Sequence, residues 1–113
     1  MAVDILAVLE RVAGRPLPTV VVEPYAGRSA YGDTYGAPVT ITAWVDQASR
    51  LVRAADGSQV VSSTTVYTRL DAVDAPPRSR VTLPDGRRTL VIASYRRDGH
   101  GIPVPEHLEI VCE

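Results

Sequence analysis

Few side chains in this sequence could take part in chemistry, and their spacing matches no known reactive arrangement. The only soft metal ligands are His100, His107 and Cys112. Zinc sites use ligands in closely spaced pairs, and these three residues do not form such pairs. The serines include no Gly-x-Ser-x-Gly elbow, and the glycines form no phosphate-binding loop between a strand and a helix. We therefore expect no metal, no cofactor and no catalytic residue.

The pattern of the C-terminal segment predicts structural roles for these three residues. Leu108, Ile110 and Cys112 alternate along the segment, so we expect them to face the core, with Glu109, Val111 and Glu113 mostly outside. Cys112 is the only cysteine, which excludes an intrachain disulfide and makes it a small core thiol. His107 is expected to form a hydrogen bond near this strand, and His100, between two glycines, to be an exposed turn residue.

Composition indicates one ordinary domain without a strong electrostatic preference. The chain has 113 residues, and its 12 basic and 13 acidic residues give a net charge of -1. The pairs at 87–88 and 96–97 are arginines that could contact phosphates, but the balanced charge favours solvated strand ends and ion pairs between subunits over sequence-specific DNA binding. Asp4 and Glu10 interrupt the apolar N-terminal segment, and we expect neither a signal peptide nor a membrane span.

The order of patterns predicts a short helix followed by strands. Residues 3–13 carry apolar side chains at helical spacing and end at Gly14, which predicts an amphipathic helix that must dock on its own sheet or on a neighbouring subunit. Residues 19–23 predict a strand. Residues 39–46 alternate strictly, which predicts a half-buried strand with Val39, Ile41, Ala43 and Val45 on the buried face.

Three Asp-Gly pairs, at residues 56–57, 85–86 and 98–99, mark tight turns between the remaining strands. Asp-Gly between apolar alternating runs is the strongest short-range hairpin signal. The connection at 71–77 ends in two prolines and should be rigid and outside the sheet. We predict a mainly β protein with one domain, residues 1–113: a helix within 1–14 and a small antiparallel β-barrel over 19–113.

Two features of this predicted fold are typical of surfaces that contact another part of the chain or another subunit. Trp44 stands on the polar face of its strand and needs cover, either from the helix or loop of its own chain or from another subunit. Residues 25–37 form a long inserted loop, which is either a mobile surface connection or a contact surface. The candidate contact residues in the loop are Tyr25, Gly27, Arg28, Tyr31, Gly32, Asp33, Tyr35 and Gly36, and the candidate interface residues elsewhere are Trp44, Arg50 and Arg53.

About two thirds of the chain, residues 39–110, resembles one family of assembly proteins. The matching motifs are Arg-Leu-Val-Arg at 50–53, Asp-Gly-Ser-Gln-Val-Val-Ser-Ser at 56–63, Arg-Val-Thr-Leu-Pro-Asp-Gly-Arg at 80–87 and Pro-Glu-His-Leu-Glu at 105–109. Their order resembles the head-to-tail joining, or stopper (head-closure), proteins of long-tailed bacteriophages, especially those of actinobacterial hosts.

The resemblance implies a structural protein of the virion neck that is made in the cytoplasm of the bacterial host. Such a protein forms a homo-oligomeric ring between the portal and its adaptor above and tail-terminator or tail-tube proteins below. A loop closes the channel over the genomic DNA, which it touches transiently and without sequence preference. Residues 25–37 would be that loop. A tail-completion or tail-terminator protein remains an alternative, as does a monomeric β-barrel binding module.

Overall fold

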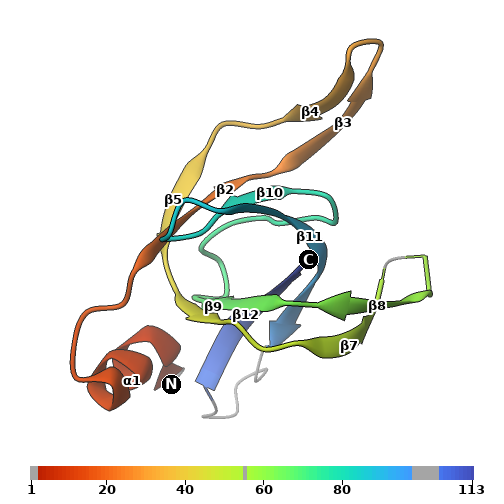
Figure 1. Ribbon diagram of the computed structural model, residues 1–113. Coiled ribbons are helices and arrows are strands. Elements are labelled where there is room, and N and C mark those ends of the chain that lie inside the picture. Colours follow the sequence, from red (N-terminus) through yellow and green to blue (C-terminus); the bar gives the residue numbers. More distant parts are fainter. Residues whose placement is uncertain (1–2, 55, 98–104) are drawn as a thin grey trace.

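The computed structural model describes residues 3–54, 56–97 and 105–113, and the mainly β fold predicted from the sequence is confirmed (Figure 1). The elements are, in chain order, β1 (Val3–Asp4), α1 (Ile5–Ala13), β2 (Thr19–Glu23), β3 (Tyr25–Ser29), β4 (Gly32–Tyr35), β5 (Val39–Thr42), β6 (Trp44–Asp46), β7 (Arg50–Arg53), β8 (Gln59–Ser62), β9 (Thr64–Thr68), β10 (Arg80–Thr82), β11 (Arg88–Arg97) and β12 (Pro105–Cys112).

The predicted helix is present but begins two residues later than expected. Val3 and Asp4 pair in parallel with the first residues of β12, so the backbone is extended there and α1 starts at Ile5. At the other end, the Gly14 amide donates to the Glu10 carbonyl at 2.9 Å, and Gly14 has a φ of 72°. Glycine adopts this left-handed conformation without strain, which makes it a common residue just beyond a helix.

The strand predicted over residues 39–46 is split into two, and the split shapes the sheet. In the described part of the chain, an eight-stranded sheet follows the order β5-β2-β10-β11-β12-β9-β6, with β1 beside β12. Its edge strands, β5 and β6, are neighbours in the chain, separated by the fully buried Ala43. The sheet therefore curls around the core until its two ends meet at one bent segment (Figure 1). No ladder between β5 and β6 is recorded for the described residues, so a closed barrel stays a prediction.

The core lies inside this curled sheet. Val20 and Val22 of β2, Val81 of β10, Val66 of β9 and Ile110 of β12 are all at most 1% exposed. The predicted alternation over residues 39–45 is confirmed, because Ile41 and Ala43 are buried and Val39 and Val45 pack against the same core.

The final strand is more deeply enclosed than its alternation indicates. Leu108, Ile110 and Cys112 are buried as predicted, and Glu113 is exposed. The prediction was wrong for Val111, at 1% exposure, and for Glu109, at 9%. Strand β12 runs between β11 and β9, so it is not an edge strand of the sheet. In this central strand both faces are covered.

Two of the three predicted Asp-Gly turns close hairpins as expected, β7–β8 and β10–β11. In both turns the aspartate accepts a hydrogen bond from the amide two residues later, and the glycine has a φ near 90°. The carboxylate thereby starts the turn and the glycine completes it. The third pair, Asp98-Gly99, lies outside the described residues, as does His100. Residues 71–77 contain no strand, as predicted.

Candidate functional site

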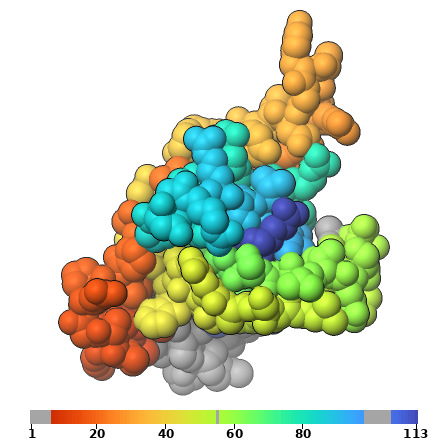
Figure 2. All heavy atoms as spheres, in the orientation of Figure 1, coloured from red at the N-terminus to blue at the C-terminus, as the bar shows by residue number. Residues whose placement is uncertain are grey.

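The segment predicted to be a long irregular loop is a β-hairpin that leaves the body of the protein (Figures 1 and 2). Strands β3 and β4 pair from Tyr25 opposite Tyr35 to Ser29 opposite Gly32. Periodic hydrophobicity did not reveal these strands, because neither of them contributes a side chain to the core. Residues 25–37 are therefore an ordered arm instead of an open loop.

The glycines of the arm serve the geometry of the hairpin. Gly27 has a φ of 111° and follows an irregularity in the strand pairing, and Gly32 has a φ of 109° where the chain leaves the turn. A residue with a Cβ rarely adopts such angles. Gly36 has no such angle, and its amide donates to the Pro24 carbonyl at 2.8 Å, which holds the two ends of the arm together.

Two arginines from a distant part of the chain hold the base of the arm. The rings of Tyr25 and Tyr35 meet edge to face with centroids 6.0 Å apart. The Arg78 guanidinium lies 5.2 Å from the Tyr25 ring centroid, and that of Arg80 lies 4.6 Å from the Tyr35 centroid. Aromatic rings attract cations at these distances. Tyr25 and Tyr35 are therefore used within the chain.

Each arginine also binds a carboxylate. Arg78 contacts Asp33 of the arm at 2.8 Å, and Arg80 binds Glu23 through two parallel hydrogen bonds of 3.0 and 2.6 Å. The hydrogen bond from Arg80 holds the pKa of Glu23 below its ordinary value, because it favours the ionised carboxylate. The Asp33 carboxylate likewise raises the pKa of Arg78. Both pairs are partly exposed, so they fix geometry more than they add stability.

The backbone before β10 helps to position these arginines. Arg78 is the one described non-glycine residue with a positive φ, 75°, and its amide donates to the Val91 carbonyl at 2.7 Å. The Ser79 hydroxyl accepts a hydrogen bond from the Tyr25 amide at 2.9 Å and donates to the Pro76 carbonyl at 2.7 Å. The sequence did not reveal this contribution, because Ser79 and Tyr25 are 54 positions apart.

The tip of the arm is exposed to solvent. Tyr31 is fully exposed, and Arg28 stands directly opposite Asp33 on the paired strand. Opposite charges at one register position leave the arm with little net charge. Of the eight loop residues singled out from the sequence, Tyr31 and Arg28 present exposed side chains near the tip. Tyr25 and Tyr35 at the base, together with Asp33 further along the arm, contact the two arginines of the body.

Trp44 is half-buried, between Ala43, which belongs to the core, and Val45, which packs against it. It lines a cavity of about 240 Å³ with Leu9 of α1, Tyr67 and His107. The arrangement favours cover by the helix of the same chain, one of the two possibilities left open by the sequence. The interface role predicted for Trp44 stays untested.

The other two interface candidates make contacts inside the chain. Arg50 donates to the Tyr67 hydroxyl at 3.2 Å and lies 3.6 Å from Asp46 and 3.5 Å from Glu109. Arg97 approaches the same Glu109 carboxylate at 3.1 Å, which explains how an acidic side chain can be buried there. Arg53 is exposed and donates to the Gly57 carbonyl at 3.1 Å, across its own turn.

Cys112 and His107, for which the sequence predicts structural roles, are packed among other side chains of the fold. Burial raises the pKa of the Cys112 thiol to about 12, so the reactive thiolate is scarce near neutral pH. The His107 ring lies 5.8 Å from that of Tyr67. Over residues 3–54, 56–97 and 105–113, no three potential metal ligands gather at one place. The same residues contain no helix with the length and apolar character needed to cross a bilayer.

Comparison of this chain with known protein families, with curated proteins and with solved structures found no match.

Proposed function

We propose that this protein is a structural subunit of the neck of a long-tailed bacteriophage, where it forms a ring between the portal adaptor and the tail and closes the DNA channel. The order of the sequence motifs at 50–63, 80–87 and 105–109 is the basis for the family, and the arm β3–β4 carries the mechanism. The arm projects from the body of the subunit (Figure 2), and none of its side chains belongs to the core.

The anchoring of the arm favours closure by a held hairpin. Arg78 and Arg80 hold its base through two ion pairs and two ring contacts, so its direction is defined by the body of the subunit. In a ring, symmetry gives every arm the same orientation to the axis, and in the proposed gate that orientation is inward. The fully exposed Tyr31 would then be the residue that meets its copies across the lumen.

The charge of the arm suits a channel through which DNA must later pass. Each phosphate contact made by a basic side chain adds to binding, and many such contacts would hold the duplex. Arg28 is paired in register with Asp33, which also binds Arg78. An arm of this kind blocks the channel by its bulk and does not bind the DNA electrostatically.

Removal of the tip tests the gate directly. Deleting Ala30 and Tyr31, which keeps Asp33 and its contact with Arg78, should allow ring assembly and release DNA from filled heads that await a tail, measured as nuclease-sensitive DNA. Tyr31→Ser tests the tip alone. Leu51→Ser is the matched control, because Leu51 is another exposed apolar residue on a different hairpin. Full DNA retention by the deletion variant, with normal rings, would contradict the gating role.

Binding to purified neck components separates the proposed role from its nearest alternative. A stopper should bind adaptor rings, whereas a tail-completion or tail-terminator protein should bind tail tubes. A chain that binds neither and remains monomeric would favour a separate binding module.

A further inference from the structure

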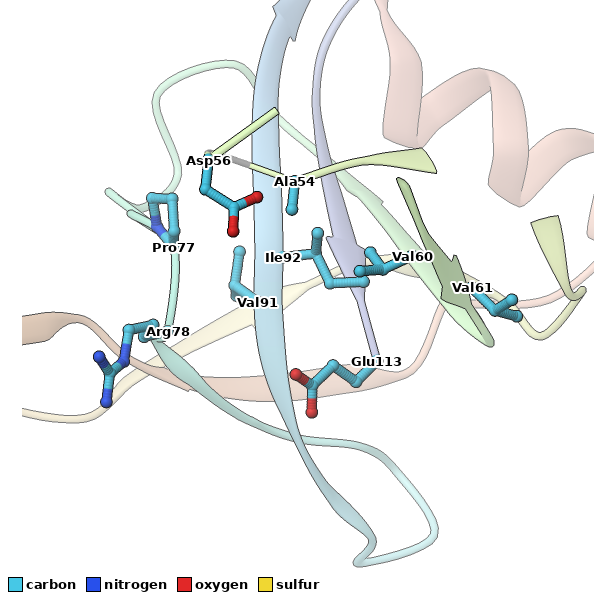
Figure 3. A pocket seen from close by; sticks show the side chains of 9 residues that line it. All are labelled: Ala54, Asp56, Val60, Val61, Pro77, Arg78, Val91, Ile92 and Glu113. Carbon is cyan, nitrogen blue, oxygen red and sulfur yellow. The ribbon is translucent and has the colours of Figure 1, made fainter. Parts of the chain in front are cut away.

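A groove on the side of the molecule away from α1 has no occupant in the described chain. It lies between the hairpin β7–β8, strand β11 and residues 77–78 and has a volume of about 640 Å³ (Figure 3). Its lining is mostly apolar. Val60 and Val61 come from β8, Val91 and Ile92 from β11, and Ala54 and Pro77 complete it.

The polar residues of this groove give it an acidic character. Asp56 and Glu113 both line it, and both are exposed. Hydrogen bonds from Ser58 hold the pKa of Asp56 below its ordinary value, so its carboxylate is ionised at neutral pH. Among the described residues, no ion pair is recorded for the side chain of Glu113. The remaining polar residue, Arg78, is bound by Asp33.

The helix α1 presents a face with the opposite character. Val12 is 76% exposed and Val8 is 36% exposed, so the described chain leaves Val12 largely uncovered and Val8 partly uncovered. Arg11 lies on the same side of the helix, three residues from Val8, and Arg15 follows just beyond the C-terminus. Both arginines are exposed, and no ion pair is recorded for either within the described residues. Nine helical residues span about 13 Å.

We propose that α1 of one copy binds in the groove of the next copy, with Val8 and Val12 against the groove valines and with Arg11 and Arg15 near Asp56 and Glu113. The occupant is a second copy because its helix supplies apolar side chains that match the apolar lining of the groove and basic side chains that match its acidic residues. This contact rests on the proposed function, since it names the interface from which the ring is built.

The positions of the two surfaces determine the symmetry of this contact. In Figure 2, α1 (red) and the hairpin β7–β8 (green) stand at opposite sides of the body, so a helix cannot enter the groove of its own chain. Because the helix and the groove lie on opposite sides of the body, two copies cannot make both reciprocal contacts at once, which argues against a two-fold dimer through this contact. Head-to-tail contacts between different surfaces generate rings when the rotation closes.

Cross-linking of the full chain tests the contact even if the assembly is weak. The variant Val12→Cys/Val61→Cys, treated with a mild oxidant, should give a ladder of linked copies on a denaturing gel. The buried Cys112 does not compete, because its thiol is inaccessible. The control Val12→Cys/Ala37→Cys carries its second cysteine at an exposed position outside the groove and should give a much weaker ladder.

Charge exchange makes the test specific. Adding Arg11→Glu should lower the yield of linked copies about tenfold, and adding Glu113→Arg to that variant should restore it. A ladder no stronger than the control, or one unaffected by either charge, would overturn the inference. If electron microscopy shows rings of the unmodified protein with adaptor while the cysteines do not link, the contact is wrong and the neck role survives. Absence of both rings and links would overturn both.

Discussion

Arg80 and Glu23 stand directly opposite each other on β10 and β2 and form a two-pronged ion pair at the base of the projecting arm. The same guanidinium lies over the ring of Tyr35, where the arm rejoins the body. One arginine of the sheet thus contacts the residues that flank the arm at both of its ends. The planar fork of arginine allows this combination, which the point charge of a lysine does not reproduce.

The Arg80–Glu23 pair should make stability depend on acid pH. The lowered pKa of Glu23 adds stability that is present above its unfolded-state value and is lost as the pH falls through the folded-state value. The difference in melting temperature between the wild type and Arg80→Gln should therefore be largest near pH 7 and shrink below about pH 4. Arg96→Gln is the control, because its partner Asp71 is 81% exposed. A difference independent of pH would contradict this account.

Gly32 should be required for an ordered arm. Gly32→Ala places a Cβ at a φ of 109°, which costs about 1–2 kcal/mol even though no atom blocks the space. Because the arm lies outside the core, we expect the amides of β3 and β4 to exchange hydrogen about tenfold faster while overall unfolding barely changes. Gly36→Ala is the matched control, since its Cβ would meet Pro24 at an ordinary 3.8 Å. Equal exchange in both variants would argue against the conformational reason.

Cys112 should react with thiol reagents only after unfolding. A pKa of about 12 lowers the thiolate fraction at pH 8 about a thousandfold relative to a free cysteine, and burial blocks access as well. A chromogenic disulfide reagent should therefore label the native protein extremely slowly and the denatured protein at once. Rapid labelling under native conditions would mean that the final strand opens readily.

Ile110 should be among the most sensitive core positions. It is a large, fully buried side chain on a central strand, so Ile110→Ala should lower the free energy of unfolding by about 3 kcal/mol in a denaturant titration. Val61→Ala removes apolar atoms from a side chain that is 65% exposed, and its effect should stay within about 0.5 kcal/mol. Similar losses from both variants would contradict the assignment of the core.

Local patterns in the sequence determined most of the scaffold. Alternation identified the buried face of residues 39–45, Asp-Gly identified the turns at 56–57 and 85–86, and helical spacing identified α1. These features depend on residues close together in the chain, which is why they could be recognised without a structure. Alternation misled only in the last strand, because it assumes one open face and β12 is covered on both.

Tertiary structure decided everything that depends on distant residues. The contacts at the base of the arm join Glu23, Tyr25 and Tyr35 to Arg78 and Arg80, and no local pattern relates them; the pairing of β2 with β10 brings them together. The arm itself forms through the pairing of β3 with β4, and the distant arginines then attach it to the body. The bend at Ala43 likewise depends on its burial inside the curled sheet. Sequence alone thus specified the strands and turns, while long-range strand pairing specified which side chains meet, since contacts across tens of residues form only when the whole sheet does.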